Sequence, residues 1–259
     1  MLAALLLLMA SPGAAQERRG FRIFPPRTEQ TDFSVNNVPY DGRITFVRLR
    51  YTPSMTGYGG GGGYFGGINY QWDHDYPRAD THVMTLIGEI TALSINADGS
   101  NILPVTDPEL LKYPIAYLVE PGFWTLTAEE AEALRNYLLK GGFLIVDDFQ
   151  GGQWWNFRER IRQVLPDASL IQLDATHAIF HSFFEIDTLD YHHPFSGVQS
   201  VFFGIFEDND PDKRLMVIVN YNNDVGEYWE WSNTGFIPIP LTNEAYKLGV
   251  NYMVYALTH

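Results

Sequence analysis

The sequence contains no cysteine among its 259 residues. Disulfide bridges, thiolate zinc sites, iron–sulfur clusters and catalytic thiols are therefore all excluded. Basic residues are also scarce, because 17 lysines and arginines stand against 31 aspartates and glutamates, and the formal net charge is −14. This balance disfavours a nucleic-acid partner, since binding to phosphates depends on basic side chains that displace counterions. It disfavours docking on an anionic membrane surface for the same reason.

The longest apolar run lies at the N-terminus, and no second run approaches the length of a membrane span. Residues 2–10 are too few to form a stable anchor in a bilayer. Ser11-Pro12-Gly13 ends the run, and small residues follow where a signal peptidase cleaves. We therefore predict a signal peptide at residues 1–15 and an exported protein, periplasmic or secreted, with no transmembrane span after cleavage. A buried N-terminal helix is the alternative.

The rest of the sequence alternates between strand-like and helix-like segments. Residues 16–42 are polar and lack periodicity, which predicts an extended N-terminal arm. The clearest unit begins with a capping box at Thr127–Glu130 and continues as a helix that ends at Gly141-Gly142. The segment Phe143–Val146 follows and is apolar on both faces, as in a central parallel strand.

This alternation predicts a single α/β domain over residues 43–259, with a mostly parallel central sheet and helices on both faces. Residues 201–206 and 214–220 flank a polar turn, which predicts an antiparallel strand pair added near the C-terminus. Asp80 and Thr242 are positioned to cap the helices that follow them.

Ligands of open parallel sheets bind beyond the carboxyl ends of the strands. Here this rule selects four loops, which span residues 52–78, 120–126, 147–153 and 174–184. The first loop is rich in glycine but lacks Gly-Lys-Ser/Thr, which favours a flap studded with aromatic residues over a nucleotide loop. The candidate ligand-binding residues of this loop and of the segment 222–231 are Tyr64, Trp72, Asp75, Trp229 and Trp231. For the segment 222–231, stacking on a sugar or binding a partner is one role, and packing of the last loop is the other.

Carboxylates and histidines in the same loops are candidates for chemistry. Asp147 and Asp148 end the buried strand, and because side chains alternate along a strand we expect only one of them to face the crevice. That carboxylate is a candidate general base or metal ligand. The alternative is that one of the two aspartates starts the next turn and the other caps a backbone group. The candidate catalytic residues are Asp147, Asp148 and His177, and the candidate metal ligands are Asp73, Asp75, Asp147, His177 and His181.

Further histidines lie close to these residues in the sequence. His74 stands between Asp73 and Asp75, and these three residues could bind a metal ion; the alternative is a solvated turn. The pair His192-His193 follows the loop of His177, and some of these histidines could bind a metal ion together with Asp147. His177 and His181 share a face only if their segment is helical, and the segment lacks the carboxylate of the zinc-peptidase motif. Ordinary capping and loop hydrogen bonds are the alternative role for all of these histidines.

Several segments together resemble a bacterial family known only as domain of unknown function 4159. These segments are Phe46–Tyr51, the glycine-rich loop with Asp75-Tyr76-Pro77, Asp107–Pro114, Leu138–Phe149, His177–Phe183 and Tyr228–Trp231. The family resembles class I glutamine-amidotransferase-like folds, which are flavodoxin-like, and the resemblance implies such a fold here. It implies no reaction and no catalytic residues. The cysteine of the true amidotransferases has no counterpart after Val146.

Two functions remain in competition. The first is a non-catalytic exported module that holds a small molecule, a glycan or an envelope protein in the crevice, since neither a cysteine nor a Gly-x-Ser-x-Gly elbow supplies a nucleophile. The second is a metal-assisted hydrolase that uses Asp147 or Asp148 with His177. The fold does not decide between them, and no cofactor is specified by the sequence. Convergence of the aspartates and histidines around one point would favour the hydrolase, because ligands lie about 2 Å from a metal ion.

Overall fold

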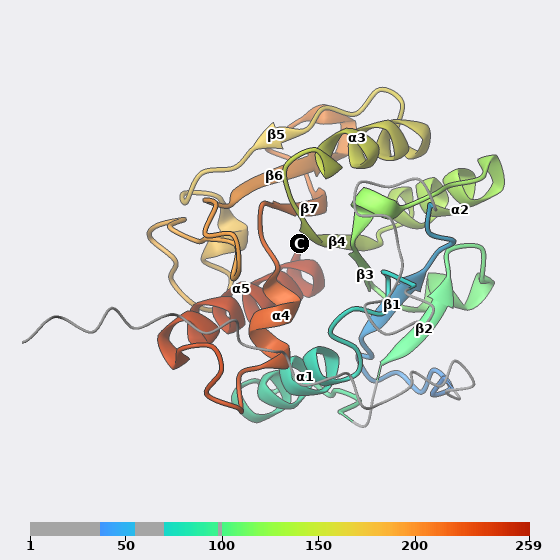
Figure 1. Ribbon diagram of the computed structural model, residues 1–259. Helices are drawn as coiled ribbons and strands as arrows, with labels where there is room; N and C mark the ends of the chain where they lie inside the picture. The colour runs from blue at the N-terminus through green and yellow to red at the C-terminus, as the bar shows by residue number, and fades with distance from the viewer. Residues whose placement is uncertain (1–36, 55–69, 98–99) are drawn as a thin grey trace, which may run out of the picture. The chain divides into compact units, whose positions relative to one another are not determined.

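The computed structural model describes residues 37–54, 70–97 and 100–259, which belong to the same unit (Figure 1). The predicted signal peptide, most of the predicted arm and Tyr64 lie outside the described residues. None of the helices in the described part of the chain combines the length and the apolar character that a membrane span requires.

A seven-stranded sheet in the order β2-β1-β3-β4-β7-β6-β5 forms the centre of the unit. The strands are β1 (Val47–Arg50), β2 (Asn101–Pro104), β3 (Ile115–Val119), β4 (Phe143–Phe149), β5 (Ile171–Gln172), β6 (Val201–Phe206) and β7 (Leu215–Tyr221). The pairs from β2 to β7 are parallel, and β6 is antiparallel to both β7 and β5. The predicted mixed sheet and its antiparallel β6–β7 pair are therefore confirmed.

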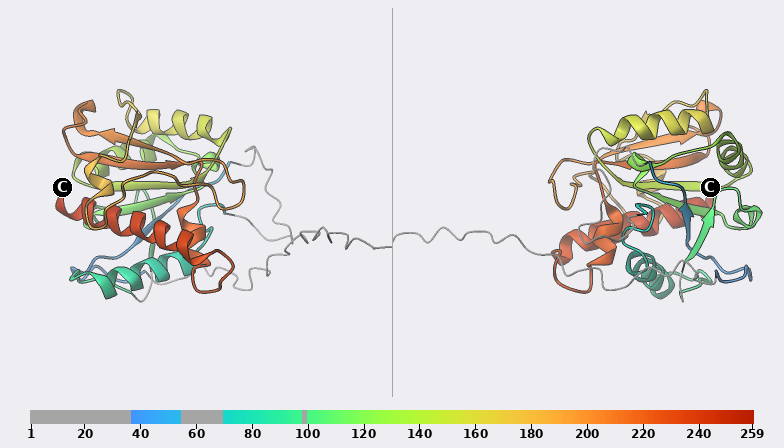
Figure 2. Two further views of the ribbon diagram at one scale, coloured as in Figure 1. Left: turned by 90° about the vertical axis from the view of Figure 1, so that its left-hand side faces the viewer. Right: turned by 45° about the vertical axis from the view of Figure 1, so that its right-hand side comes forward.

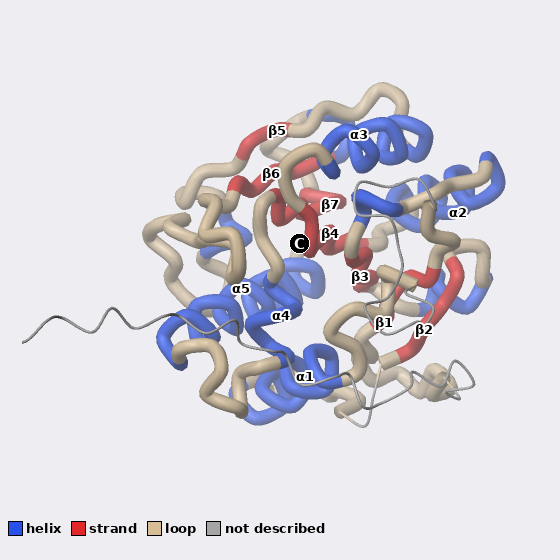
Figure 3. The backbone as a smooth tube through the Cα atoms, in the orientation of Figure 1, coloured by secondary structure: helices blue, strands red, loops and turns tan. Residues whose placement is uncertain are grey.

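Helices cover both faces of this sheet. They are α1 (Arg78–Ile90), α2 (Ala128–Leu139), α3 (Gln153–Val164), α4 (Val225–Glu230) and α5 (Ile239–Thr258). Figure 1 and Figure 2 show α1, α4 and α5 on one side of the strands and α2 and α3 on the other. In Figure 3 the strands β3, β4 and β7 run between these two groups.

The side chains of the central strands divide between two cores. In β4, Phe143 and Ile145 pack towards α1 and α5, whereas Leu144 and Val146 pack towards α2 and α3. This alternation follows from the period of two residues along a strand, and it explains why β4 is apolar throughout. It also places Asp147 on the face of Ile145, below α4 and α5.

Of the helix caps predicted from the sequence, one is confirmed and two are wrong. The capping box of α2 is present, because Thr127 Oγ1 accepts the Glu130 N–H and Glu130 accepts the Thr127 N–H. The predicted caps at Asp80 and Thr242 are wrong, because α1 begins at Arg78 and α5 at Ile239, so both residues lie inside the first turn. Asp80 is instead drawn into a buried ion pair with Arg48.

Candidate functional site

The carboxyl ends of the parallel strands bring polar side chains to one edge of the sheet. The loop after β1 carries His74, Glu120 follows β3, Asp148 lies near the end of β4, and Asp224 follows β7. His193 reaches the same edge because it precedes β6. The strand β6 is antiparallel to β7, so its first residue, Val201, pairs with Tyr221 at the end of β7.

Three of these side chains form a first set of potential metal ligands. Donor atoms of His74, Glu120 and Asp148 all lie within 4.8 Å of one another. His74 Nδ1 is 3.0 Å from a carboxylate oxygen of Glu120 and 3.6 Å from one of Asp148. Burial disfavours the charged imidazole, but the two carboxylates outweigh burial and raise the pKa of His74 well above 6.5. In the first set, the protonated His74 is therefore the positive charge that pairs with the Glu120 and Asp148 carboxylates.

A second set shares Asp148 with the first. Donor atoms of Asp148, His193 and Asp224 again lie within 4.8 Å of one another, and all three residues are buried. Burial lowers the pKa of His193 to about 4, so its imidazole is neutral at physiological pH. Burial and then the Asp148 carboxylate raise the pKa of Asp224 well above 3.8.

More acidic groups surround these two sets. Donor atoms of Asp75, Glu227 and Glu230 lie within 4.8 Å of one another. Burial and then the carboxylate of Asp75 raise the pKa of Glu227 to about 9. The edge therefore holds more buried carboxylates than its histidines can neutralise.

The backbone at this edge is held in an uncommon conformation. The backbone φ angles of Glu120, Asp148 and Asp75 are 51°, 57° and 64°. These values lie in the left-handed region, which residues other than glycine rarely adopt. Each such residue costs on the order of 1–3 kcal/mol and persists only where the surrounding structure imposes it. At Asp148 the conformation coincides with an irregularity in the β4–β7 pairing between Val146 and Phe149. This break lets Asp147 and Asp148 take different roles.

Asp147 has a structural role. Its Oδ2 accepts hydrogen bonds from the Tyr117 hydroxyl and from the backbone N–H groups of Val225 and Gly226, at 2.7, 2.8 and 3.0 Å. Its Oδ1 accepts the Asn220 amide at 3.0 Å. Asp147 is fully buried and joins β4 to the first turn of α4. Of the two adjacent aspartates, the one that lies among the potential ligands is Asp148.

A buried arginine positions the loop that carries His74. Arg48 is fully buried and contacts the Asp80 carboxylate through two nitrogens, at 2.5 and 3.2 Å. It also donates to the carbonyl oxygens of Trp72 and His74, at 3.1 and 2.7 Å. Ser100 donates to Asp80 at 2.6 Å. The ion pair therefore fixes the backbone on both sides of Asp73.

The structure places His177 away from Asp147 and Asp148. His177 begins the short 3₁₀ turn η3 (Ala178–Phe180) and packs against Phe206 and Tyr255, with ring centroids 5.5 and 5.9 Å apart. Phe206 ends β6, so this contact lies at the amino-terminal edge of the parallel strands, where His177 lines a separate pocket of about 650 Å³. The set of Asp147 or Asp148 with His177 does not converge.

His181 is also outside the site, because its ring nitrogens contact Glu185 and the Ala175 carbonyl, both at 2.6 Å. Since η3 is a single turn, the two histidines do not form the helical pair that their spacing allowed. Asp73 and Asp75 are buried in the loop before α1, and Asp75 belongs to the acidic surroundings of the site.

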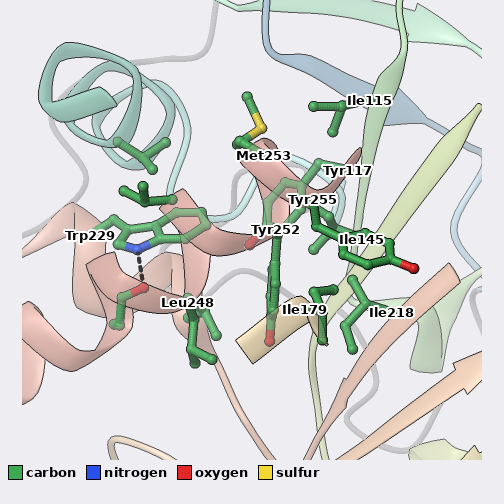
Figure 4. Close-up of a cluster of buried hydrophobic side chains, with 14 of the residues drawn as sticks. Ile115, Tyr117, Ile145, Ile179, Ile218, Trp229, Leu248, Tyr252, Met253 and Tyr255 are labelled. Atoms are coloured by element: carbon green, nitrogen blue, oxygen red, sulfur yellow. Dashed lines mark hydrogen bonds between the residues drawn. The ribbon is translucent and has the colours of Figure 1, made fainter. Parts of the chain in front are cut away.

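The tryptophans proposed for ligand binding are mostly core residues. Trp229 is 1% exposed, and its indole N–H donates to the Ala245 carbonyl inside the cluster shown in Figure 4. Trp72 is equally buried, against Tyr70. Trp231 is partly exposed, but its ring is covered by Arg78 at 4.6 Å and packs on Phe236. Trp72 and Trp229 thus present no open face on which a sugar could stack.

The residues that sequence reasoning missed have one shared signal. Glu120 and Asp224 each follow the last residues of a parallel strand, but neither is among the candidates predicted from the sequence. His74 and His193 are among the histidines considered for a metal site, but not among the candidate ligands. Only the strand order shows that the segments after β1, β3, β4 and β7 end side by side.

The buried charge of Asp148 leads to a prediction about stability. Burial and then the Glu120 carboxylate raise its pKa well above 3.8, so the folded chain holds a proton that the unfolded chain has lost. Stability of the chelator-treated protein should therefore fall as the pH rises from about 4 towards the folded-state pKa. Asp148→Asn should raise the free energy of unfolding at pH 8 by more than about 1 kcal/mol, since one pKa unit is worth about 1.4 kcal/mol.

Urea unfolding at pH 5 and pH 8 measures this effect. The difference between wild type and variant should be smaller at pH 5. A variant that is less stable than the wild type at pH 8 would contradict the assignment of Asp148 as a carboxylate whose ionisation is disfavoured by burial and by Glu120.

Comparison with known families gives one match over most of the chain. The model described as Domain of unknown function (DUF4159) matches residues 45–257. This range contains every member of both ligand sets. Comparison with curated proteins gives no match.

Proposed function

The chain belongs to the DUF4159 family of domains of unknown function, and we propose that it is a metal-dependent hydrolase whose centre is built on Asp148. The observation that carries this proposal is the convergence of His74, Glu120 and Asp148 donor atoms within 4.8 Å of one another. One imidazole nitrogen with carboxylate oxygens suits Zn²⁺, Mn²⁺ or Fe²⁺. The proposal retains the metal-assisted hydrolase hypothesis but replaces His177 with His74.

The number of protein ligands favours catalysis over a purely structural site. Structural zinc sites are closed by four protein ligands, whereas catalytic sites use three and leave a position for water. The side chains of His74 and Glu120 are 29% and 12% exposed, so solvent reaches this set. An ion held there would lower the pKa of its bound water towards neutrality and supply a hydroxide nucleophile without a cysteine or serine.

The competing hypothesis of a non-catalytic binding module has less support at this edge. It relied on aromatic side chains as a platform, and Trp72 and Trp229 are buried in the core. The buried carboxylates at the edge are costly without a cation, whereas a metal ion would offset their repulsion. The electrostatics therefore favour an ion over an uncharged ligand.

Metal binding by the purified full chain tests the proposal. After chelation and dialysis, Mn²⁺ and Zn²⁺ titrations by calorimetry should show binding, and Asp148→Asn should weaken it by at least about 100-fold, because loss of a direct ligand should exceed the 10–100-fold cost of losing an outer-shell partner. Asp208→Asn is the matched control, since this carboxylate is 72% exposed and pairs with Lys213 outside the site. The control should bind like the wild type.

Water access to the ion separates a catalytic centre from a structural one. The Mn²⁺-loaded protein should enhance the relaxation of bulk water protons, and it should hydrolyse activated aryl esters or phosphoesters only when metal is present. Absence of metal binding would overturn the proposal. Binding without an exchangeable water would leave a metal site but overturn the hydrolase.

A further inference from the structure

Asp148 belongs to two sets of donor atoms at once. His74 and Glu120 lie on one side of it, and His193 and Asp224 complete the second set, with each set spanning no more than 4.8 Å. We propose that the centre is dinuclear, with the Asp148 carboxylate bridging one ion held by His74 and Glu120 and a second ion held by His193 and Asp224. This inference rests on the proposed function, since it assumes that the first set binds metal.

The chemistry of the shared residue fits a bridge. An ionised carboxylate has two oxygens and can give one to each ion. Two-metal hydrolytic sites hold their ions about 3.5–4 Å apart, which a shared carboxylate imposes. The left-handed backbone of Asp148, with φ of 57°, places this side chain at the break in the β4–β7 pairing. Asp147 cannot replace Asp148 as the bridging ligand, because its carboxylate is engaged by Tyr117, Asn220 and the first turn of α4. Phe149, the other neighbour, has no ligand atom in its side chain.

The second set comes from elements that the sheet holds together. Asp224 is the N-cap of α4, where its Oδ1 accepts the Glu227 N–H at 2.9 Å. Ring nitrogen Nε2 of His193 lies 3.1 Å from the side-chain amide nitrogen of Gln150, two residues after Asp148. His193 and Asp224 are 5% and 4% exposed. An ion here would be shielded from solvent more than the first ion.

The placement of the carboxylates gives a second argument for another ion. Asp148 and Asp224 are both buried, and their donor atoms lie within 4.8 Å of each other. One dication held by His74, Glu120 and Asp148 leaves Asp224 without an ion of its own. A second dication among Asp148, His193 and Asp224 would offset the repulsion between these two buried carboxylates.

The two ions should differ in affinity. His193 Nδ1 accepts the backbone N–H groups of Phe195 and Ser196 at 3.2 and 3.4 Å. An ion at Nε2 requires the ring proton to move to Nδ1, where it faces these two donors. These two hydrogen bonds to Nδ1 are long, but they must break before the ring can bind a metal ion through Nε2. The ion at His74 and Glu120 should therefore bind first and more tightly.

Electron paramagnetic resonance during a Mn²⁺ titration of the full chain tests the inference. The first equivalent should give the spectrum of an isolated ion, and the second should give a spin-coupled spectrum, with saturation at two ions per chain. Asp224→Asn should keep the first ion and weaken the second by at least tenfold, without coupling. Asparagine is an equally good N-cap, so this variant should preserve α4. His193→Gln is the second variant and should have the same effect.

The outcomes separate this inference from the function on which it rests. Saturation at one ion in the wild type, unchanged in Asp224→Asn, overturns the dinuclear centre and leaves the hydrolase proposal intact. Two ions without spin coupling, with the second retained in Asp148→Asn, place the second ion elsewhere and also overturn it. No binding at all overturns both proposals.

Discussion

Asp147→Ala is expected to lower the free energy of unfolding by about 3–5 kcal/mol, because it leaves several buried donors without an acceptor, at about 1–3 kcal/mol each. The donors are the Tyr117 hydroxyl, the Asn220 amide and the N–H groups of Val225 and Gly226. Asn220 also accepts the Tyr252 hydroxyl at 2.9 Å, so the loss extends to α5. Asp147 is 0% exposed, and water cannot replace it without opening the core.

The adjacent aspartate gives the matched comparison. In urea unfolding of the chelator-treated protein at pH 8, Asp147→Ala should destabilise the fold while Asp148→Asn stabilises it. Both residues are buried carboxylates of β4, and the opposite signs are expected from their different partners. A loss below about 1 kcal/mol for Asp147→Ala would show that its hydrogen bonds are not a structural link between β4 and α4.

Arg48→Met should have an effect of similar size, lowering the free energy of unfolding by about 3–5 kcal/mol. The substitution leaves the buried Asp80 carboxylate without its cation, and breaking one side of a buried ion pair is strongly destabilising. It also frees the Trp72 and His74 carbonyls, which fix the position of the His74 side chain. Mn²⁺ affinity should therefore fall by about 10–100-fold.

A double variant distinguishes stability from positioning. Arg48→Met with Asp80→Leu removes both charges, and such apolar replacements of buried pairs often recover stability. The double variant should regain most of the free energy of unfolding but not the metal affinity, because the two carbonyls still lack their donor. Recovery of both would contradict the role of Arg48 in placing His74.

These variants concern one edge of the sheet, where the protein concentrates unfavourable features. The left-handed backbone at Glu120, Asp148 and Asp75 and the buried carboxylates all lie there. The two cores consist of buried apolar side chains on either face of the sheet. A fold tolerates such a concentration of cost where function requires it, which is the general trade between stability and activity.

The sequence by itself determined the features that depend on neighbours along the chain. The capping box at Thr127 and Glu130 formed as predicted because its partners are three residues apart. The mostly parallel sheet and the added β6–β7 pair followed from the alternation of periodicities. Three of the four selected loops carry His74, Glu120 and Asp148, which meet at the carboxyl ends of the strands as strand direction predicts, whereas the loop 174–184 takes His177 to the other edge.

Only the tertiary structure decided what each polar side chain does. Asp80 looked like a helix cap, but Arg48 from β1 lies beside it in the fold and pairs with it. His177 looked like a partner for Asp148, but η3 turns it towards Phe206 at the other edge of the sheet. His74, Glu120, His193 and Asp224 meet because the strand order places distant segments together. Burial and electrostatic pairing act through space between residues far apart in the chain, so spacing along the sequence could not assign these roles.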